Sequence, residues 1–244
     1  PAAPPLAGVG VALELALAVS RRLDREPCGR VLNPLLELAA IGTVADCVPL
    51  TGANRAIVRA GLAALQRTSF PGLRALMEQA RTEFVRSTWE IAFLLAPRLN
   101  AAGRIEAADV ALDLLLTDDF ARAAVLARQL EDANRERQQI ERRLLESAIH
   151  TVERDGLAEH AAALVLSGAD WHLGVIGIVA TRLVARYGRP IAIISIQPGG
   201  PARGSVRGIE GVDVTAALRE CSPLLVRYGG HSQAAGLELD PKLV

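Results

Sequence analysis

Residues 161–196, AAALVLSGADWHLGVIGIVATRLVARYGRPIAIISI, determine the fold class of the C-terminal part of this chain. Ala161–Leu166 is a short apolar run that predicts a buried strand, and Ile191–Ile196 predicts a second one. Between them, Gly174–Tyr187 has the length and apolar spacing of a helix, which ends at Gly188-Arg189-Pro190. A strand, a helix and a strand at this spacing predict a right-handed crossover between two parallel strands.

The residues after this crossover predict further strands and one more helix. A turn is expected at Pro198–Pro201, followed by a short strand at Arg203–Arg207 and a helix at Asp213–Cys221. Tyr228-Gly229-Gly230-His231 predicts a tight turn, because two adjacent glycines permit unusual backbone angles. The last strand is expected near Ala234–Leu239, which completes a mixed sheet.

Upstream, the chain is mainly helical by its apolar spacing. Pro34 is expected at the first position of a helix, because it follows Asn33, a residue type that caps helices, and this helix should end near Ile41. The other expected helices are Val11–Leu23, Asn54–Gln66, Leu73–Ala80 and Ala107–Leu116.

A long uninterrupted helix is expected between these two parts. Thr117 can cap it, Asp118 and Asp119 suit the positive end of its dipole, and no Gly or Pro interrupts the chain as far as Asp155. Its ends are apolar on one side, whereas its middle, Glu131–Arg143, is almost wholly polar. This pattern predicts a solvated connector between two lobes, although an amphipathic helix on a single domain is the alternative. The fold class is therefore α/β, with a mainly helical first lobe and a second lobe built on a mixed sheet.

Composition excludes several classes of protein. Half of the 244 residues are apolar and 22% are charged, which suffices for a buried core in one large or two modest domains. No uncharged apolar run is long enough to cross a membrane. Cys28, Cys47 and Cys221 are too far apart for a metal site, so three reduced thiols in a cytoplasmic protein are expected. The chain opens on the linker-like Pro1–Pro5 without Met, and we expect it to be a piece of a longer protein.

The basic residues are unevenly distributed, although the net charge is zero. Of the 27 basic side chains, 26 are arginine, and residues 171–231 hold seven arginines against three acids. Genomic base composition explains the excess of arginine equally well. The uneven distribution nevertheless favours one basic region that can bind a polyanion, since guanidinium groups contact phosphate through two parallel donors.

Asp46 is the only charged residue between Leu38 and Leu50. A carboxylate among apolar neighbours must be solvated, hydrogen-bonded or bound to a cation. Capping of the local turn and binding of a metal ion both remain open for it.

Three further segments could bind an anion. His172 lies in a loop between a strand and a helix N-terminus, where anions bind favourably, but it could equally cap that helix. Arg203, Ser205 and Arg207 share one side of an extended chain, and solvated arginines on an edge strand are the alternative. His231 follows two glycines, which suits either a functional or an ordinary turn.

In their order along the chain, seven blocks resemble the DHH phosphoesterase superfamily, and specifically the RecJ-type single-strand-specific exonucleases. The blocks are residues 6–12, 42–50, 97–104, 134–138, 171–180, 203–207 and 229–236, which include LAGVGVA, GTVAD, PRLNAAGR, NRERQ, WHLGVIGIVA, RGSVR and GGH. The resemblance therefore spans nearly the whole chain.

The resemblance implies a catalytic DHH domain and a DHH-associated domain, joined by a long helix and facing each other across a groove. On this basis residues 1–117 are the C-terminal part of the DHH domain, 118–156 the connector and 157–244 the DHH-associated domain. The family holds two Mn²⁺ or Mg²⁺ ions with Asp and His side chains, and Asp46 matches its last metal-binding motif. The earlier motifs are absent, so the remaining ligands are expected before Pro1, and the 244-residue chain alone is expected to be inactive.

The resemblance also implies a substrate and its contacts. The full protein is expected to be a 5′→3′ exonuclease of single-stranded DNA in DNA repair and recombination. Ser205 and Arg207 match contacts to the terminal phosphate, with Arg203 beside them, and His231 in Gly229-Gly230-His231 matches a catalytic position near the scissile phosphate. Further contacts to the strand are expected from Arg104, Gln138, His172 and Arg182.

Two rival functions remain open. One is a related phosphodiesterase of short oligonucleotides or cyclic dinucleotides, and the other is a catalytically inactive homologue that only binds single strands. The resemblance further implies a monomer, which could act beside a single-strand-binding protein or a helicase.

Overall fold

The computed structural model describes residues 5–23, 29–105 and 108–244, so Pro1–Pro4, Cys28 and Ala107 of the sequence analysis lie outside the described residues. The chain divides into two compact units, residues 1–134 and 135–244. The division falls within one long helix, α8 (Phe120–Arg154). In the described part of the chain, no helix is both long and apolar enough to cross a membrane.

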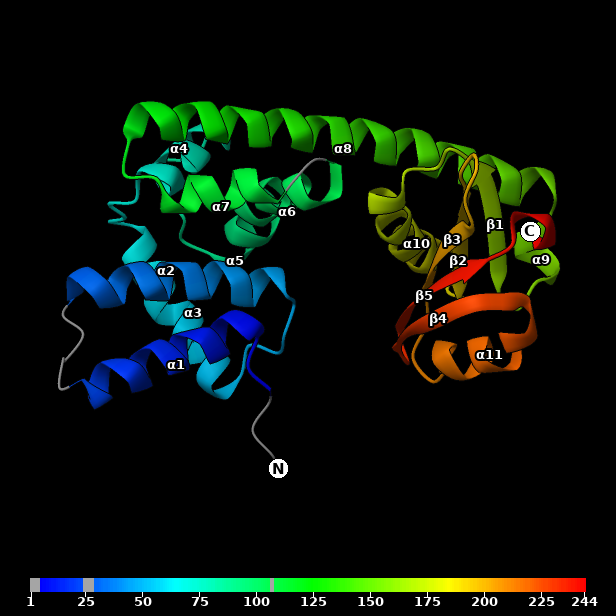
Figure 1. The fold of residues 1–244 in the computed structure, drawn as a ribbon, viewed down its shortest axis with the longest axis horizontal. Coiled ribbons are helices and arrows are strands. Elements are labelled where there is room, and N and C mark those ends of the chain that lie inside the picture. Colours follow the sequence, from blue (N-terminus) through cyan, green and yellow to red (C-terminus); the bar gives the residue numbers. More distant parts are fainter. Residues whose placement is uncertain (1–4, 24–28, 106–107) are drawn as a thin grey trace. The chain divides into compact units, whose positions relative to one another are not determined.

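The first unit is built from helices, as its apolar spacing predicts (Figure 1). Its helices are α1 (Gly8–Arg22), α2 (Gly29–Ala45), α3 (Gly52–Leu65), α4 (Pro71–Gln79), α5 (Thr88–Glu90), the π-helix η1 (Ile91–Leu95), α6 (Ala96–Ile105), α7 (Asp109–Leu116) and the first half of α8. Leucine, isoleucine, valine and alanine dominate its core, in which Leu76, Leu95 and Leu114 are fully buried.

The prediction for Pro34 was wrong. Helix α2 begins at Gly29, so Pro34 lies inside it rather than at its start, and the helix continues to Ala45 instead of ending near Ile41. A proline at this place removes one backbone hydrogen bond of the helix. Ala39 and Ala40 of the same helix are fully buried, and α2 packs against α1 and α3, contacts that the local capping pattern at Asn33 could not reveal.

Helix α8 exists as predicted, but it starts two residues later. Asp119, not Thr117, caps it, because the Asp119 carboxylate accepts hydrogen bonds from the backbone N–H of Ala121 at 2.8 Å and of Arg122 at 3.3 Å. The Thr117 hydroxyl instead accepts from the backbone N–H of Asp119 at 3.2 Å.

The middle of α8 is not solvated all round, which corrects the expectation for Glu131–Arg143. Glu131, Asn134 and Glu141 are buried, at 7%, 2% and 3% exposure. Within the first unit, Arg98 of α6 pairs with Glu131, with 2.7 Å between Nε and the carboxylate oxygen. Buried carboxylates that are paired in this way appear polar in sequence yet belong to the packed interior.

The second unit is a five-stranded mixed sheet with helices, which confirms the predicted fold class (Figure 1). Its strands are β1 (Leu164–Ala169), β2 (Ile191–Ile196), β3 (Ala202–Arg207), β4 (Leu225–His231) and β5 (Ala234–Leu239), in the order β1-β2-β3-β5-β4. Among these five described strands, β1 and β2 are the one parallel pair, and helix α10 (Leu173–Tyr187) connects them. The remaining helices are α9 (Leu157–His160), α11 (Val214–Glu220) and the short 3-10 turns η2 (Ser222–Leu224) and η3 (Pro241–Leu243). The first strand begins three residues later than the predicted Ala161.

Tyr228–His231 is not a turn, which corrects a second prediction. These residues form the end of β4, and the turn lies at Ser232 and Gln233. Gly230 has a φ of 151°, and a Cβ atom there would lie 2.4 Å from the carbonyl oxygen of Ala234. The glycine is therefore needed where β4 approaches β5 closely, rather than for a reversal of the chain.

Different helices pack against the two faces of the sheet. Helix α11 packs against one face, where Val214 and Leu218 join a core with Ile194, Val206 and Leu237. Asp213 caps α11 as its predicted start suggests, and its hydrogen bonds from Thr215 and Ala216 hold the pKa of this carboxylate below its usual value. Helix α10 contacts β2 and β3. On the face that α10 partly covers, β3, β5 and β4 carry polar side chains.

Candidate functional site

Polar side chains from three neighbouring strands lie in rows on one face of the sheet. Side chains alternate between the faces of a strand, so Arg203, Ser205 and Arg207 of β3 share this face. Opposite residues of paired strands lie on the same face as well. The register gives three rows across β3, β5 and β4, namely Arg207–Ala234–His231, Ser205–Gly236–Gly229 and Arg203–Glu238–Arg227.

The centre of this face has almost no side chains. Gly229 and Gly236 form the middle row with Ser205, and Ala234 is the only residue between Arg207 and His231. A floor of glycine and alanine lets a ligand approach the backbone closely. The structure thus brings together, on one face of the sheet, five of the residues named from the sequence, Arg203, Ser205, Arg207, Gly229 and His231.

Arg207 and Ser205 are held in one arrangement. The Arg207 Nη1 donates hydrogen bonds to the Ser205 hydroxyl at 2.8 Å and to the carbonyl oxygen of Val206 at 2.9 Å. Both side chains are partly buried beneath α10. At Gly177 of that helix, a Cβ atom would lie 2.8 Å from the Arg207 Nη2 and 3.0 Å from the Ser205 hydroxyl oxygen. Gly177 therefore makes room for this pair, a role that its position in the helix did not reveal.

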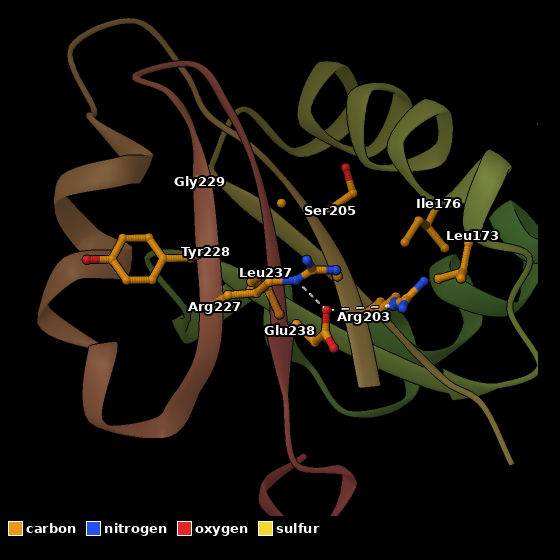
Figure 2. A pocket seen from close by; sticks show the side chains of 11 residues that line it. Leu173, Ile176, Arg203, Ser205, Arg227, Tyr228, Gly229, Leu237 and Glu238 are labelled. Atoms are coloured by element: carbon orange, nitrogen blue, oxygen red, sulfur yellow. Dashed lines mark hydrogen bonds and ion pairs between the residues drawn. The ribbon is translucent and has the colours of Figure 1, made fainter. Parts of the chain in front are cut away.

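A pocket of about 570 Å³ adjoins Ser205 on the same face (Figure 2). Its polar wall includes Arg203, Arg227 and Glu238, and Leu173 and Ile176 of α10 form an apolar wall. Sequence reasoning missed Arg227 and Glu238. Alternation along the strand could have placed Arg227 on the face of Gly229, but only the pairing of β4 with β5 brings Glu238 to it.

His172 lies elsewhere in the second unit. It caps α10, and its Nδ1 accepts a hydrogen bond from the backbone N–H of Gly174 at 3.2 Å. It lines a separate pocket with Trp171, Asp170 and, from α8, Arg143. The capping alternative of the sequence analysis is thus realised, while the proposed contact with a strand remains a prediction.

Arg182 and Gln138 do not line the pocket on the sheet face. Arg182 of α10 pairs with Glu141 of α8, with 2.6 Å between its Nε and the carboxylate oxygen, and Arg137 pairs with the same carboxylate at 2.5 Å. The Arg182 side chain is still 60% exposed. Gln138 is exposed on α8.

The first unit has its own candidate site around Asp46. This exposed carboxylate lies just after the end of α2, where its backbone N–H donates to the carbonyl oxygen of Gly42 at 3.0 Å. It lines a pocket of about 630 Å³ with Asn100 and Arg104 of α6. The pocket therefore joins two sequence blocks, GTVAD and PRLNAAGR, and combines a carboxylate with a guanidinium group.

The donors present at Asp46 do not complete a metal site. A carboxylate suits Mg²⁺ or Mn²⁺, but both ions take several oxygen or nitrogen ligands. Among the described residues, no three His, Cys, Asp or Glu side chains are grouped closely enough to hold an ion. Asp46 can thus supply one ligand, and the exposed Cys47 beside it has no partner cysteine among the described residues.

Comparison with known proteins gives the same relationship as the seven sequence blocks. Residues 160–243 match the family model of the DHHA1 domain. The single-stranded-DNA-specific exonuclease RecJ of Bacillus subtilis is 43% identical over 96% of this chain, which spans 29% of that relative. The protein of the same name from Thermus thermophilus is 40% identical over 97% of the chain, which spans 33% of that relative.

Solved structures agree with these relatives. The crystal structure of RecJ with Mg²⁺ from Thermus thermophilus matches 96% of the chain at 39% identity with a TM-score of 0.83, and the chain covers 35% of it. A structure of exonuclease RecJ bound to manganese matches 96% of the chain at 39% identity with a TM-score of 0.80, and the chain covers 56% of it. The chain is therefore similar, along nearly its whole length, to part of the RecJ exonucleases, and its residues 160–243 match the DHHA1 domain model.

Proposed function

We propose that this chain is part of a metal-dependent 5′→3′ exonuclease of single-stranded DNA. The observation that carries the proposal is the sheet face on which Arg203, Ser205, Arg207 and His231 surround a floor of glycine and alanine. The names of the relatives, which describe single-stranded-DNA-specific exonucleases, support the substrate.

Ser205 and Arg207 are proposed to hold the terminal phosphate of the strand. A guanidinium group binds a phosphate through two parallel N–H donors, and the Ser205 hydroxyl adds another donor. The hydrogen bond between the two side chains keeps the guanidinium group in place before a ligand arrives, which lowers the entropic cost of binding. His231, in the same row as Arg207, is proposed to contact the scissile phosphate.

Asp46 is proposed as one ligand of the Mg²⁺ or Mn²⁺ ions that the related structures contain. Such ions, when bound, activate water and stabilise the charge that develops on a phosphodiester. Arg104 lines the same pocket and can contact the phosphate backbone. Within the family scheme, residues 1–117 would be the C-terminal part of the DHH domain, 118–156 the connector and 157–244 the DHH-associated domain.

The 244-residue chain alone is expected to hydrolyse no single-stranded DNA. The physical reason is that Asp46 is one carboxylate, and the described residues group no three metal ligands. Incubation of a labelled strand with the purified chain and Mn²⁺ or Mg²⁺ checks this expectation on a gel. Release of mononucleotides that disappears in Asp46→Asn would show that the chain completes a metal site of its own.

Binding is the direct test of the proposed substrate. In fluorescence anisotropy without divalent ions, the chain should bind a 5′-phosphorylated oligothymidylate more tightly than its 5′-hydroxyl form or a blunt duplex. Affinity should fall with salt, because each neutralised phosphate of a single strand contributes about 0.7 to the logarithmic slope. Tighter binding of a cyclic dinucleotide than of the long strand would instead favour the rival phosphodiesterase.

A further inference from the structure

The row Arg203–Glu238–Arg227 contains two residues that neither the sequence nor the proposed function assigns to a role. Arg203 lies on β3, Glu238 on β5 and Arg227 on β4, and the register makes them direct neighbours. Glu238 is only 12% exposed, whereas the Arg203 and Arg227 side chains are 50% and 72% exposed. The row therefore presents two accessible guanidinium groups around one largely buried carboxylate.

The contacts of this row leave most of its donors available. The Arg227 Nε donates to the Glu238 Oε2 at 2.6 Å, and the Arg203 Nε lies 3.8 Å from the same oxygen. Within the described part of the chain, neither guanidinium group has another hydrogen bond or ion pair. Their Nη atoms thus remain free to donate, and the row combines two guanidinium groups with a single carboxylate.

The pocket beside this row has room for a ligand that extends from Ser205. Arg203 and Arg227 line it together with Ser205 and Gly229, and Figure 2 shows the two guanidinium groups on either side of Glu238. Arg203 is two residues from Ser205 on β3, which is about 7 Å along a strand. A second anionic group can therefore bind next to one that Ser205 contacts, because the glycine floor places no side chain between the two groups.

We propose that Arg203 and Arg227 form a second phosphate-binding position, which takes an internal phosphate of the strand whose terminal phosphate is held by Ser205 and Arg207. This inference rests on the proposed function and adds Arg227 to the nucleic-acid interface. The hydrogen bond from the Arg227 Nε to the Glu238 carboxylate holds this guanidinium group, so that its Nη donors are left to contact the ligand. Two guanidinium groups on one phosphate match its several acceptor oxygens.

The test compares a ligand that has only the terminal phosphate with ligands that also have internal phosphates. Arg227→Ala should weaken binding of a short oligothymidylate about 10-fold, as expected for the loss of a charge-assisted hydrogen bond. The loss should be equal for 5′-phosphorylated and 5′-hydroxyl strands, and the salt slope should fall by about 0.7. Binding of thymidine 5′-monophosphate, which has only the terminal phosphate, should stay unchanged in titration calorimetry, whereas the 5′-phosphorylated trinucleotide, which has an internal phosphate besides the one proposed for His231, should bind more weakly.

Arg219→Ala is the matched control. It removes the same charge from an exposed position on α11, which packs against the opposite face of the sheet, and it should alter none of these affinities. An Arg227→Ala chain that binds the strand as wild type does, or that loses affinity for 5′-phosphorylated strands alone, overturns the second position while the proposed function stands. If the wild-type chain binds no single strand at all, both proposals fall.

Discussion

Replacement of Arg207 by Ala is expected to weaken binding of a 5′-phosphorylated single strand by roughly 10- to 100-fold. This range corresponds to about 1.5–3 kcal/mol for hydrogen bonds to a charged group. The same change should reduce binding of the 5′-hydroxyl strand much less, because Arg207 and Ser205 are proposed to contact the terminal phosphate. Fluorescence anisotropy with the two strands at one salt concentration measures both losses.

Two further variants separate charge from geometry at this position. Arg207→Lys keeps the positive charge but cannot donate two parallel hydrogen bonds, so it should recover only part of the affinity. Gly177→Ala should act in the same direction as Arg207→Ala, because its Cβ would lie 2.8 Å from the Arg207 Nη2 and displace the guanidinium group. Equal losses on the two strands would remove the role of Arg207 at the terminal phosphate.

Replacement of Glu141 by Ala should destabilise the second unit by about 3–5 kcal/mol, the usual cost of removing one partner of a buried ion pair. Glu141 is only 3% exposed, and it pairs with both Arg137 and Arg182. Its loss removes the carboxylate that lies 2.5 Å from the Nη1 of Arg137, whose side chain is only 12% exposed. Chemical denaturation followed by circular dichroism measures the free energy of unfolding.

The surroundings of Glu141 provide the controls. Glu146→Ala removes an exposed carboxylate from the same helix and should change the stability by no more than about 0.5 kcal/mol. Arg182→Ala should cost about 1 kcal/mol or less, since this partner is 60% exposed and solvent screens its charge. A Glu141→Ala chain as stable as Glu146→Ala would mean that the carboxylate is well solvated instead.

Elements with strong local patterns were predicted with accurate bounds. The strand predicted at Ile191–Ile196 matches β2 residue for residue, because its apolar run is bounded by Pro190 and Gln197, and the strand expected near Ala234–Leu239 is β5. Pro34 and Tyr228–His231 were misassigned for a common reason. In both cases a residue that often interrupts regular structure lies inside it, where packing against another segment outweighs the local preference.

In the candidate site, too, local patterns predicted some residues correctly and missed those whose contacts come from distant segments. Alternation along β3 was sufficient to place Arg203, Ser205 and Arg207 on one face. No recognisable motif marks Arg227 or Glu238, and the polar pattern of the long helix predicts that Glu131 and Glu141 are solvated residues of a connector. Each of these side chains acquires its role from a partner on another strand or helix.

The sequence by itself determined the α/β class, the helical first unit, the long helix, and the relationship to RecJ through seven ordered blocks. Only the tertiary structure decided that Arg207 and His231 share a row, that glycine and alanine form the floor between them, and that Arg203 and Arg227 meet at Glu238. The reason is physical. Periodicity and capping act within a few residues, whereas strand register and charge pairing depend on segments far apart in the chain.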